Sequence, residues 1–311
     1  MIEAPPRSPI RREPSPVPAV LRRSRNGEPG SRSGRAKAGA TILTAVAIAL
    51  ALYFLIPILW MLFASTKDTS DLNTSFGFWF AAPHFLQNVQ DLFAYQGGIF
   101  FRWMGNSLIY SGLGSLGATL FSAAAGYALA KYRFRGRDAI MALILGGVLI
   151  PETVLALPTY LLLNSMGLVN TYWAVLLPSL ASTFGVFLSR VYVSASVPRE
   201  ILEAARVDGA GEFRVFGTIV LRMIVPCLVT IFLFNFISIW NNFFLPLIVL
   251  NDQSSWPVTL GLYSMQQSSQ SSPDLVRLVV MGSMLSTIPL VILFLGLQRY
   301  WRSGITSGAL K

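Results

Sequence analysis

Residues 198–226 read PREILEAARVDGAGEFRVFGTIVLRMIVP, a charged and glycine-interrupted stretch between two long apolar segments. Ser196 is a suitable N-cap for a helix, and Pro198 suits the first turn. Gly209 can adopt the left-handed conformation that ends such a helix. The pattern predicts a short amphipathic helix, a turn, and a second helical piece over about 212–217. Taken alone, it is compatible both with a solvated connecting loop and with a surface that another protein approaches closely.

The composition places this stretch in a membrane protein. Of the 311 residues, 53% are hydrophobic and only 12% are charged, whereas soluble domains are about twice as charged. Apolar stretches longer than about 18 residues recur, and each can cross a bilayer core of about 30 Å. The sequence therefore predicts an all-α membrane protein with six transmembrane helices, over about 40–63, 107–130, 139–163, 172–189, 223–249 and 278–297.

The basic residues predict the topology. With these spans, 21 of the 24 Lys and Arg residues fall on one side, and only Lys67, Arg102 and Arg277 fall on the other. Cytoplasmic loops carry such an excess, so both termini and the central stretch are expected in the cytoplasm. The net charge of +10 follows from this pattern, and no nucleic-acid partner is expected. Residues 1–38 are basic and proline-rich and predict a disordered tail, and 39–311 form the transmembrane domain.

Several kinds of site are excluded. Cys227 is the single cysteine and His84 the single histidine, so neither a disulfide framework nor a metal site is expected. The chain has no GxxxxGK[ST] loop and cannot cradle ATP phosphates in the usual way. Any ATP-driven motor must therefore be another polypeptide, which would bind ATP and Mg. No pair of carboxylates at hydrolase spacing lies in the membrane region.

Glu152 is the one acidic residue expected deep in the membrane. A charged carboxylate there costs about 2.5–3.5 kcal/mol on insertion scales unless it is hydrated, paired or protonated. It follows Pro151, which removes a backbone donor, and Pro158 repeats the defect. Broken membrane helices are tolerated where they line a cavity. Glu152 is therefore a candidate for a solute pathway, with a structural hydrogen bond to a neighbouring helix as the alternative.

The fifth expected span carries a second polar group. Asn235, Ser238 and Asn242 fall at helical spacing on one face, and Asn241 lies beside them. Their amides and hydroxyl suit hydrogen bonding to hydroxyl-rich solutes. Polar contacts between helices are the competing explanation.

Two outer segments connect the spans. Residues about 64–105 are rich in aromatic side chains and predict an interfacial helix. Residues about 251–274 are polar and long, with Trp256, Tyr263 and Gln266 among them, and we expect this segment to be flexible on its own. It is either a passive connector or a contact for a partner on the outer face.

The central stretch resembles the EAA motif of ABC importer permeases. The resemblance rests on Glu203-Ala204-Ala205, Asp208-Gly209-Ala210, Phe216, Ile219, Leu221 and Pro226. In that family the loop, here about 196–218, is the coupling helix that docks into a cleft of a separate ATPase subunit. The resemblance thus implies that Glu203, Ala204, Ala205, Asp208, Gly209, Ala210 and Phe216 couple the chain to the ATPase. Arg222 stands where the family usually carries proline, a departure that bears on the bend at the start of the next helix and not on docking.

The similarity extends over residues 57–311. The segment 126–137, the proline pair Pro151 and Pro158, and the ending 298–311 look like those of carbohydrate permeases of the maltose type. This resemblance implies a type I importer permease for a sugar or sugar-like solute. It also implies a second, related permease subunit, two ATPase subunits, an extracytoplasmic solute-binding protein and a lipid bilayer as partners. By the same resemblance, the stretch from Trp256 to Gln267 would enter the cleft of the binding protein.

The resemblance also implies that the chain has no enzyme activity of its own. Two other functions fit the sequence less well. A proton-coupled secondary transporter would explain Glu152, but it would not explain the loop from Glu203 to Gly209. A membrane-embedded glycosyltransferase would need an acidic pair near one face, which the sequence lacks.

Overall fold

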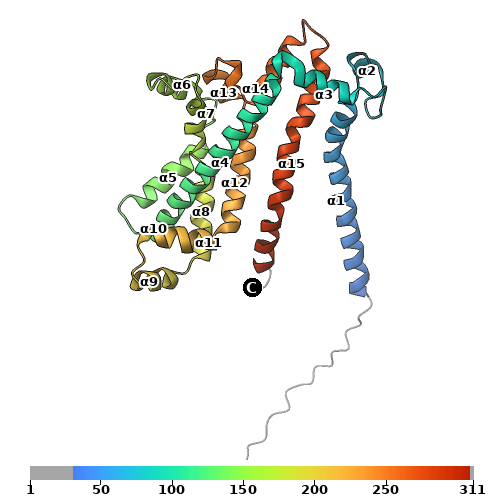
Figure 1. Ribbon diagram of the computed structural model, residues 1–311. Helices are drawn as coiled ribbons and strands as arrows, with labels where there is room; N and C mark the ends of the chain where they lie inside the picture. The colour runs from blue at the N-terminus through green and yellow to red at the C-terminus, as the bar shows by residue number, and fades with distance from the viewer. Residues whose placement is uncertain (1–30, 309–311) are drawn as a thin grey trace, which may run out of the picture. The chain divides into compact units, whose positions relative to one another are not determined.

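The protein is all-helical. The computed structural model describes residues 31–308, with side chains over 39–300 (Figure 1), and this part of the chain contains no strand. The α-helices are α1 (Ser31–Ala64), α2 (Thr69–Thr74), α3 (Phe85–Ala94), α4 (Ile99–Lys131), α5 (Arg137–Val148), α6 (Ala156–Ser165), α7 (Tyr172–Ser179), α8 (Thr183–Ser196), α9 (Arg199–Val207), α10 (Glu212–Arg214), α11 (Leu221–Met223), α12 (Val225–Trp240), α13 (Phe244–Val249), α14 (Val258–Ser268) and α15 (Leu275–Gly308). Two 3-10 helices, η1 (Tyr95–Gly97) and η3 (Gln253–Ser255), and a π-helix, η2 (Val215–Val220), lie between them. The predicted all-α class is confirmed.

The chain divides into two units, Met1–Ile56 and Pro57–Lys311. In the described residues, the first unit is the N-terminal part of α1. This helix begins at Ser31, inside the 1–38 segment that we expected to be a disordered tail. The last proline of that segment precedes Ser31, so the backbone can already be helical there. The remainder of the predicted tail, 1–30, lies outside the described residues.

Four helices of the described chain are long and apolar enough to cross a membrane, namely Gly39–Ala64, Ile99–Lys131, Tyr172–Ser196 and Leu275–Tyr300. A bent pair, Glu212–Met223 and Val225–Trp240, joined at an angle of 82°, is a candidate for a fifth. The span expected at 139–163 is not one helix. It consists of α5 with 12 residues and α6 with 10, interrupted near Pro151, and neither reaches the length of about 20 residues that a span needs. The count of six spans and the side of the termini stay predictions.

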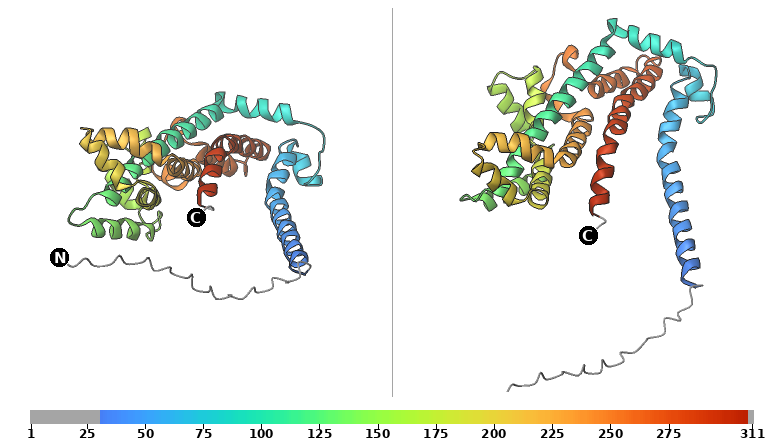
Figure 2. Two further views of the ribbon diagram at one scale, coloured as in Figure 1. Left: turned by 90° about the horizontal axis from the view of Figure 1, so that it is seen from below. Right: turned by 60° about the horizontal axis from the view of Figure 1, so that its bottom comes forward.

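Helix α4 is the centre of the second unit. It packs most extensively against α8 and α12. Small residues allow α4 and α8 to approach closely, because a Cβ added to Gly126 would lie 2.5 Å from Ser189 Oγ, and one on Gly185 would lie 2.4 Å from Ser122 Oγ. Figure 1 shows α9, α10 and α11 near one end of α4 and α13 and α14 near the other, and Figure 2 shows the same helices from two further sides.

The central loop forms the predicted helix and turn, with one correction at its start. Ser196 is the last residue of α8 rather than the N-cap of α9, because α8 continues to the end of its polar stretch and Pro198 takes the cap position. Gly209 has a φ of +80°, the left-handed conformation expected at the end of α9. Arg222 does not remove the bend that follows, since the chain turns by 82° at Ile224.

The outer segment 251–274 is not the flexible loop that its polar composition predicted. Its central part is the ordered helix α14, with 11 residues, whose buried residues are Val258, Leu260, Gly261, Leu262 and Met265. Gly261 allows α14 to lie directly on α4, because a Cβ there would come within 2.2 Å of the Trp103 ring. The prediction was wrong because the apolar positions of this segment are buried by a helix about 150 residues earlier in the chain. A helix is present within 64–105 as α3, and its interfacial position stays a prediction.

Candidate functional site

A cavity of about 360 Å³ lies among the broken helices of the second unit. Its walls come from the break between α5 and α6, from α7 and the start of α8, and from α12 and α13. The polar lining residues are Glu152, Thr153, Thr159, Ser179, Thr183, Asn235, Ser238 and Asn242. The volume falls in the range of about 300–1,000 Å³ that is typical of small-molecule sites.

The lining favours an uncharged, hydrogen-bonding ligand. Glu152 is its single charged residue, and no Lys or Arg contributes to the walls. Glu152 forms no ion pair with the described residues. The Nδ2 atom of Asn235 is buried without a hydrogen-bond partner. A buried donor left unpaired costs about 1–3 kcal/mol, so contacts within the described chain do not account for this amide.

Four of the five residues predicted for the pathway meet in this cavity. Glu152 comes from the interrupted third segment, and Asn235 and Ser238 come from α12, as their spacing indicated. Asn242 also lines the cavity, but it lies in the break between α12 and α13 rather than on the helix, so the helical face expected for all three residues holds only for Asn235 and Ser238. Asn241 does not line the cavity, and its Nδ2 donates to the Ile237 carbonyl at 2.9 Å. Sequence reasoning missed the hydroxyl residues Thr153, Thr159, Ser179 and Thr183, because isolated hydroxyls in apolar helices carry no distinctive signal.

The central loop presents a polar and small-residue surface. Of the residues implied in ATPase coupling, Glu203, Ala204, Asp208 and Gly209 are exposed. The other three, Ala205, Ala210 and Phe216, pack against a buried core formed by α4, α8, α9, η2 and α12. The Phe216 ring lies 5.6 Å from the Tyr127 ring in this core. Phe216 therefore supports the loop from within rather than forming part of its outer surface.

Two apolar side chains on the outside of this loop were not predicted. Phe213 is 95% exposed and Val207 is 88% exposed. Val207 follows the buried Leu202 by five residues, which places it about 140° away around α9 at 3.6 residues per turn. That helical spacing is the signal that could have identified Val207.

A polar contact ties the central loop to α4. The Tyr132 hydroxyl, at the C-cap of α4, donates to Oε2 of Glu212 in α10. Arg206 Nε of α9 donates to the other carboxylate oxygen, Oε1, at 2.8 Å. The adjacent Lys131 Nζ donates to the Val197 carbonyl at 2.5 Å. We call Tyr132, Glu212 and Arg206 the inner tether.

The opposite end of α4 holds the start of the outer segment. Trp103 Nε1 donates to the Gln253 carbonyl at 3.0 Å, and the Tyr110 hydroxyl donates to the Ser255 carbonyl at 2.8 Å. Asn106 Nδ2 bonds the carbonyls of Ser254 and Trp256 at 2.8 and 2.9 Å. We call Trp103, Asn106 and Tyr110 the outer clasp. Within the clasped segment, hydrogen bonds from Ser254 hold the pKa of Asp252 below its usual value.

The residues expected to meet a binding protein differ in exposure. Trp256 is half-buried, packs against two buried clusters, and donates from Nε1 to the Leu250 carbonyl at 3.3 Å. Tyr263 is exposed and rests on Phe243, with ring centroids 4.6 Å apart. Gln266 is exposed. Trp256 is thus a packing residue, and Tyr263 and Gln266 remain the candidates for an outer contact.

Comparison with known proteins identifies the family. Residues 118–307 match the model of the binding-protein-dependent transport system inner membrane component. The chain belongs to this family. It is 33% identical over 270 residues to the arabinooligosaccharides transport system permease protein AraQ of Bacillus subtilis, covering 86% of this chain and 95% of AraQ. It is 29% identical over 283 residues to the melibiose/raffinose/stachyose import permease protein MelC of the same organism, covering 90% of this chain and 99% of MelC.

A solved structure has the same fold. The chain matches a subunit of a bacterial ABC transporter involved in the import of the acidic polysaccharide alginate, with a TM-score of 0.73 and 22% identity. The match covers 86% of this chain and 98% of that one. The protein is therefore a multi-pass inner membrane permease with a type I ABC importer fold, and such permeases are not enzymes. Membership of this family does not favour the alternative of a proton-coupled carrier.

Proposed function

We propose that this chain is the permease subunit of an ATP-driven importer that passes an uncharged sugar or sugar-like solute into the cytoplasm. The observation that carries the solute class is the cavity of α5–α8, α12 and α13, with its hydroxyls, amides and single carboxylate. The relatives named for arabinooligosaccharides and for melibiose, raffinose and stachyose support it. Because the cavity offers no cation, an acidic sugar fits it less well than a neutral one.

We further propose that the 198–217 loop couples the chain to a separate ATPase. Glu203, Ala204, Asp208 and Gly209 belong to the exposed surface of this loop, as do Val207 and Phe213. Two ATPase subunits, which bind ATP and Mg, would drive the cycle, because this chain has no phosphate-binding loop. A second, related permease would complete the membrane part, as the resemblance implies.

The solute would arrive on an extracytoplasmic binding protein. The family model is named for dependence on such proteins. A solved alginate transporter in complex with an alginate pentasaccharide-bound periplasmic protein matches this chain with a TM-score of 0.59. Tyr263 and Gln266 at the exposed end of α14 are proposed to meet that partner.

The test is reconstitution of the chain in proteoliposomes with its second permease, ATPase subunits and binding protein. Uptake of labelled neutral oligosaccharides should require both internal ATP and the binding protein. An acidic oligosaccharide of equal length serves as the comparison solute and should be taken up more slowly. Uptake driven by a proton gradient without ATP would contradict the proposal.

A further inference from the structure

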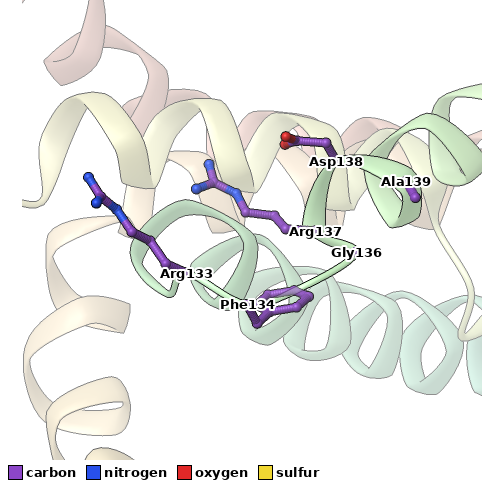
Figure 3. Close-up of a pocket in the computed structure, with 6 residues that line it drawn as sticks. All are labelled: Arg133, Phe134, Gly136, Arg137, Asp138 and Ala139. Carbon is purple, nitrogen blue, oxygen red and sulfur yellow. The ribbon is translucent and has the colours of Figure 1, made fainter.

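A second pocket lies on the predicted cytoplasmic side, in the connection between α4 and α5. It has a volume of about 350 Å³ and is lined by Arg133, Phe134, Gly136, Arg137, Asp138 and Ala139 (Figure 3). In Figure 3 the guanidinium groups of Arg133 and Arg137 extend toward the same side of the connection. This basic pocket is separate from the solute cavity and shares no lining residue with it.

The pocket contains several hydrogen-bond donors without acceptors. Arg133 and Arg137 form no ion pair with the described residues, and Arg137 Nε is buried without a partner. Gly136, the N-cap of α5, has no side chain to accept from the first turn. The backbone N–H groups of Asp138 and Ala139 have no acceptor in the described chain. A ligand with several acceptor oxygens and a negative charge is the chemical complement of this set.

The charge balance also favours an anion. The lining contains two guanidinium groups and one carboxylate, that of Asp138, so it keeps a net positive charge. Arginine binds phosphate oxygens through two parallel N–H groups, which gives geometry as well as attraction. Arg137 cannot be deprotonated to relieve its unpaired Nε. An anion in the pocket would offset the positive charge of its guanidinium group.

The location of the pocket indicates the source of the anion. Arg133 follows the end of the apolar helix α4 at Lys131 by two residues, so we expect it near the lipid headgroups. Below it, α5 exposes Ile140 and Leu143, the latter 77% exposed, and Phe134 is exposed beside the arginines. Hydrogen-bond donors for a phosphate thus lie directly next to an apolar helix face. This arrangement is complementary to a phospholipid, whose headgroup would lie at the donors and whose acyl chains would lie along the helix.

We propose that this pocket binds the phosphate of an anionic phospholipid, whose acyl chains lie along the exposed face of α5. Binding would hold the α4–α5 connection at the headgroup layer. The proposal rests on membrane insertion alone and does not depend on which solute is transported.

The neighbouring Arg135 provides a matched control. It lies in the same connection and is exposed, but it does not line the pocket. A general attraction of basic loops to the membrane, or a role in setting topology, depends on charge count and treats Arg133 and Arg135 alike. A specific phosphate site would instead depend on Arg133 and not on Arg135.

The experiment uses the full chain in nanodiscs with equal amounts of phosphatidylglycerol and phosphatidylcholine, followed by detergent extraction and native mass spectrometry of the retained lipid. The wild type should retain phosphatidylglycerol preferentially. Arg133→Gln and Arg137→Gln should each lower that retention about tenfold, since each removes charge-assisted hydrogen bonds from a guanidinium group to the phosphate. Arg135→Gln should change it less than twofold. Because Arg133 is exposed, its variant tests the site without disturbing the fold.

Three results would overturn the proposal. The first is an equal loss of phosphatidylglycerol retention in all three variants, which would indicate a general attraction to basic charge and no specific binding site. The second is an absence of preference for phosphatidylglycerol in the wild type. The third is complete displacement of the lipid by millimolar inorganic phosphate, which would indicate that a soluble anion is the ligand.

Discussion

Asn235 is the residue at which packing and solute binding make opposite predictions. Its buried Nδ2 has no partner, so an apolar side chain of similar size removes an unsatisfied donor. We expect Asn235→Leu to keep or raise the thermal stability of the purified transporter, while the KM for solute uptake rises about tenfold. Asn241→Leu is the control, because Asn241 lies outside the cavity. A loss of stability in Asn235→Leu with unchanged KM would indicate that the amide holds helices together.

Glu152 sets the charge of the cavity. Its carboxylate is the single charge in the lining, so it should repel an anionic sugar by about 1 kcal/mol at the effective dielectric of a hydrated cavity. We expect Glu152→Gln to raise the uptake of an acidic oligosaccharide about fivefold relative to a neutral one of equal length. Competition between the two labelled solutes in proteoliposomes measures this ratio. An unchanged ratio would place the carboxylate away from the solute path.

At the scale of elements, the inner tether connects α9 and α10 to the end of α4. Arg206 and Glu212 are about half exposed in their side chains, and exposed ion pairs contribute only about 0–1 kcal/mol. The inner tether should therefore fix the position of α9 and α10 relative to α4 and add little to the stability of the protein. We expect Tyr132→Phe and Glu212→Gln to lower the stimulation of ATPase activity by loaded binding protein at least threefold, with little change in melting temperature.

Tyr192→Phe is the matched control for the tether. Tyr192 packs against the same buried core but has no contact with Glu212. Its variant should keep wild-type stimulation. If Tyr192→Phe and Tyr132→Phe behaved alike, the effect would belong to the core and not to the tether.

The sequence predicted elements where the signal is local. The turn at Gly209 depends on one residue's backbone freedom, and the shared face of Asn235 and Ser238 depends on helical spacing. Prediction from the sequence failed where contacts between distant segments of the chain decide which residues are buried. The polar outer segment is ordered because Gly261 meets Trp103, and Phe216 turns inward because Tyr127 lies beneath it. Neither contact can be read from the local composition.

At the scale of the whole molecule, α4 joins the outer clasp to the inner tether. Its first turns hold η3 through Trp103, Asn106 and Tyr110, and its C-cap holds the central loop through Tyr132. The helix between them is unbroken over 33 residues and packs tightly against α8. A displacement of the outer segment can therefore reach the 198–217 loop, which we propose to couple to the ATPase, through one rigid element.

A double-mutant cycle tests whether α4 is the route. Asn106→Leu removes two hydrogen bonds of the clasp, and Tyr132→Phe removes one of the tether. If both act through α4, ATPase stimulation by loaded binding protein should be no lower in the double variant than in the more impaired of the two single variants. Two independent routes would instead give effects that multiply, because distant sites without a shared mechanism contribute additive free energies. Basal ATPase activity without binding protein should stay unchanged in all three variants, since neither residue lies on the exposed surface of the 198–217 loop.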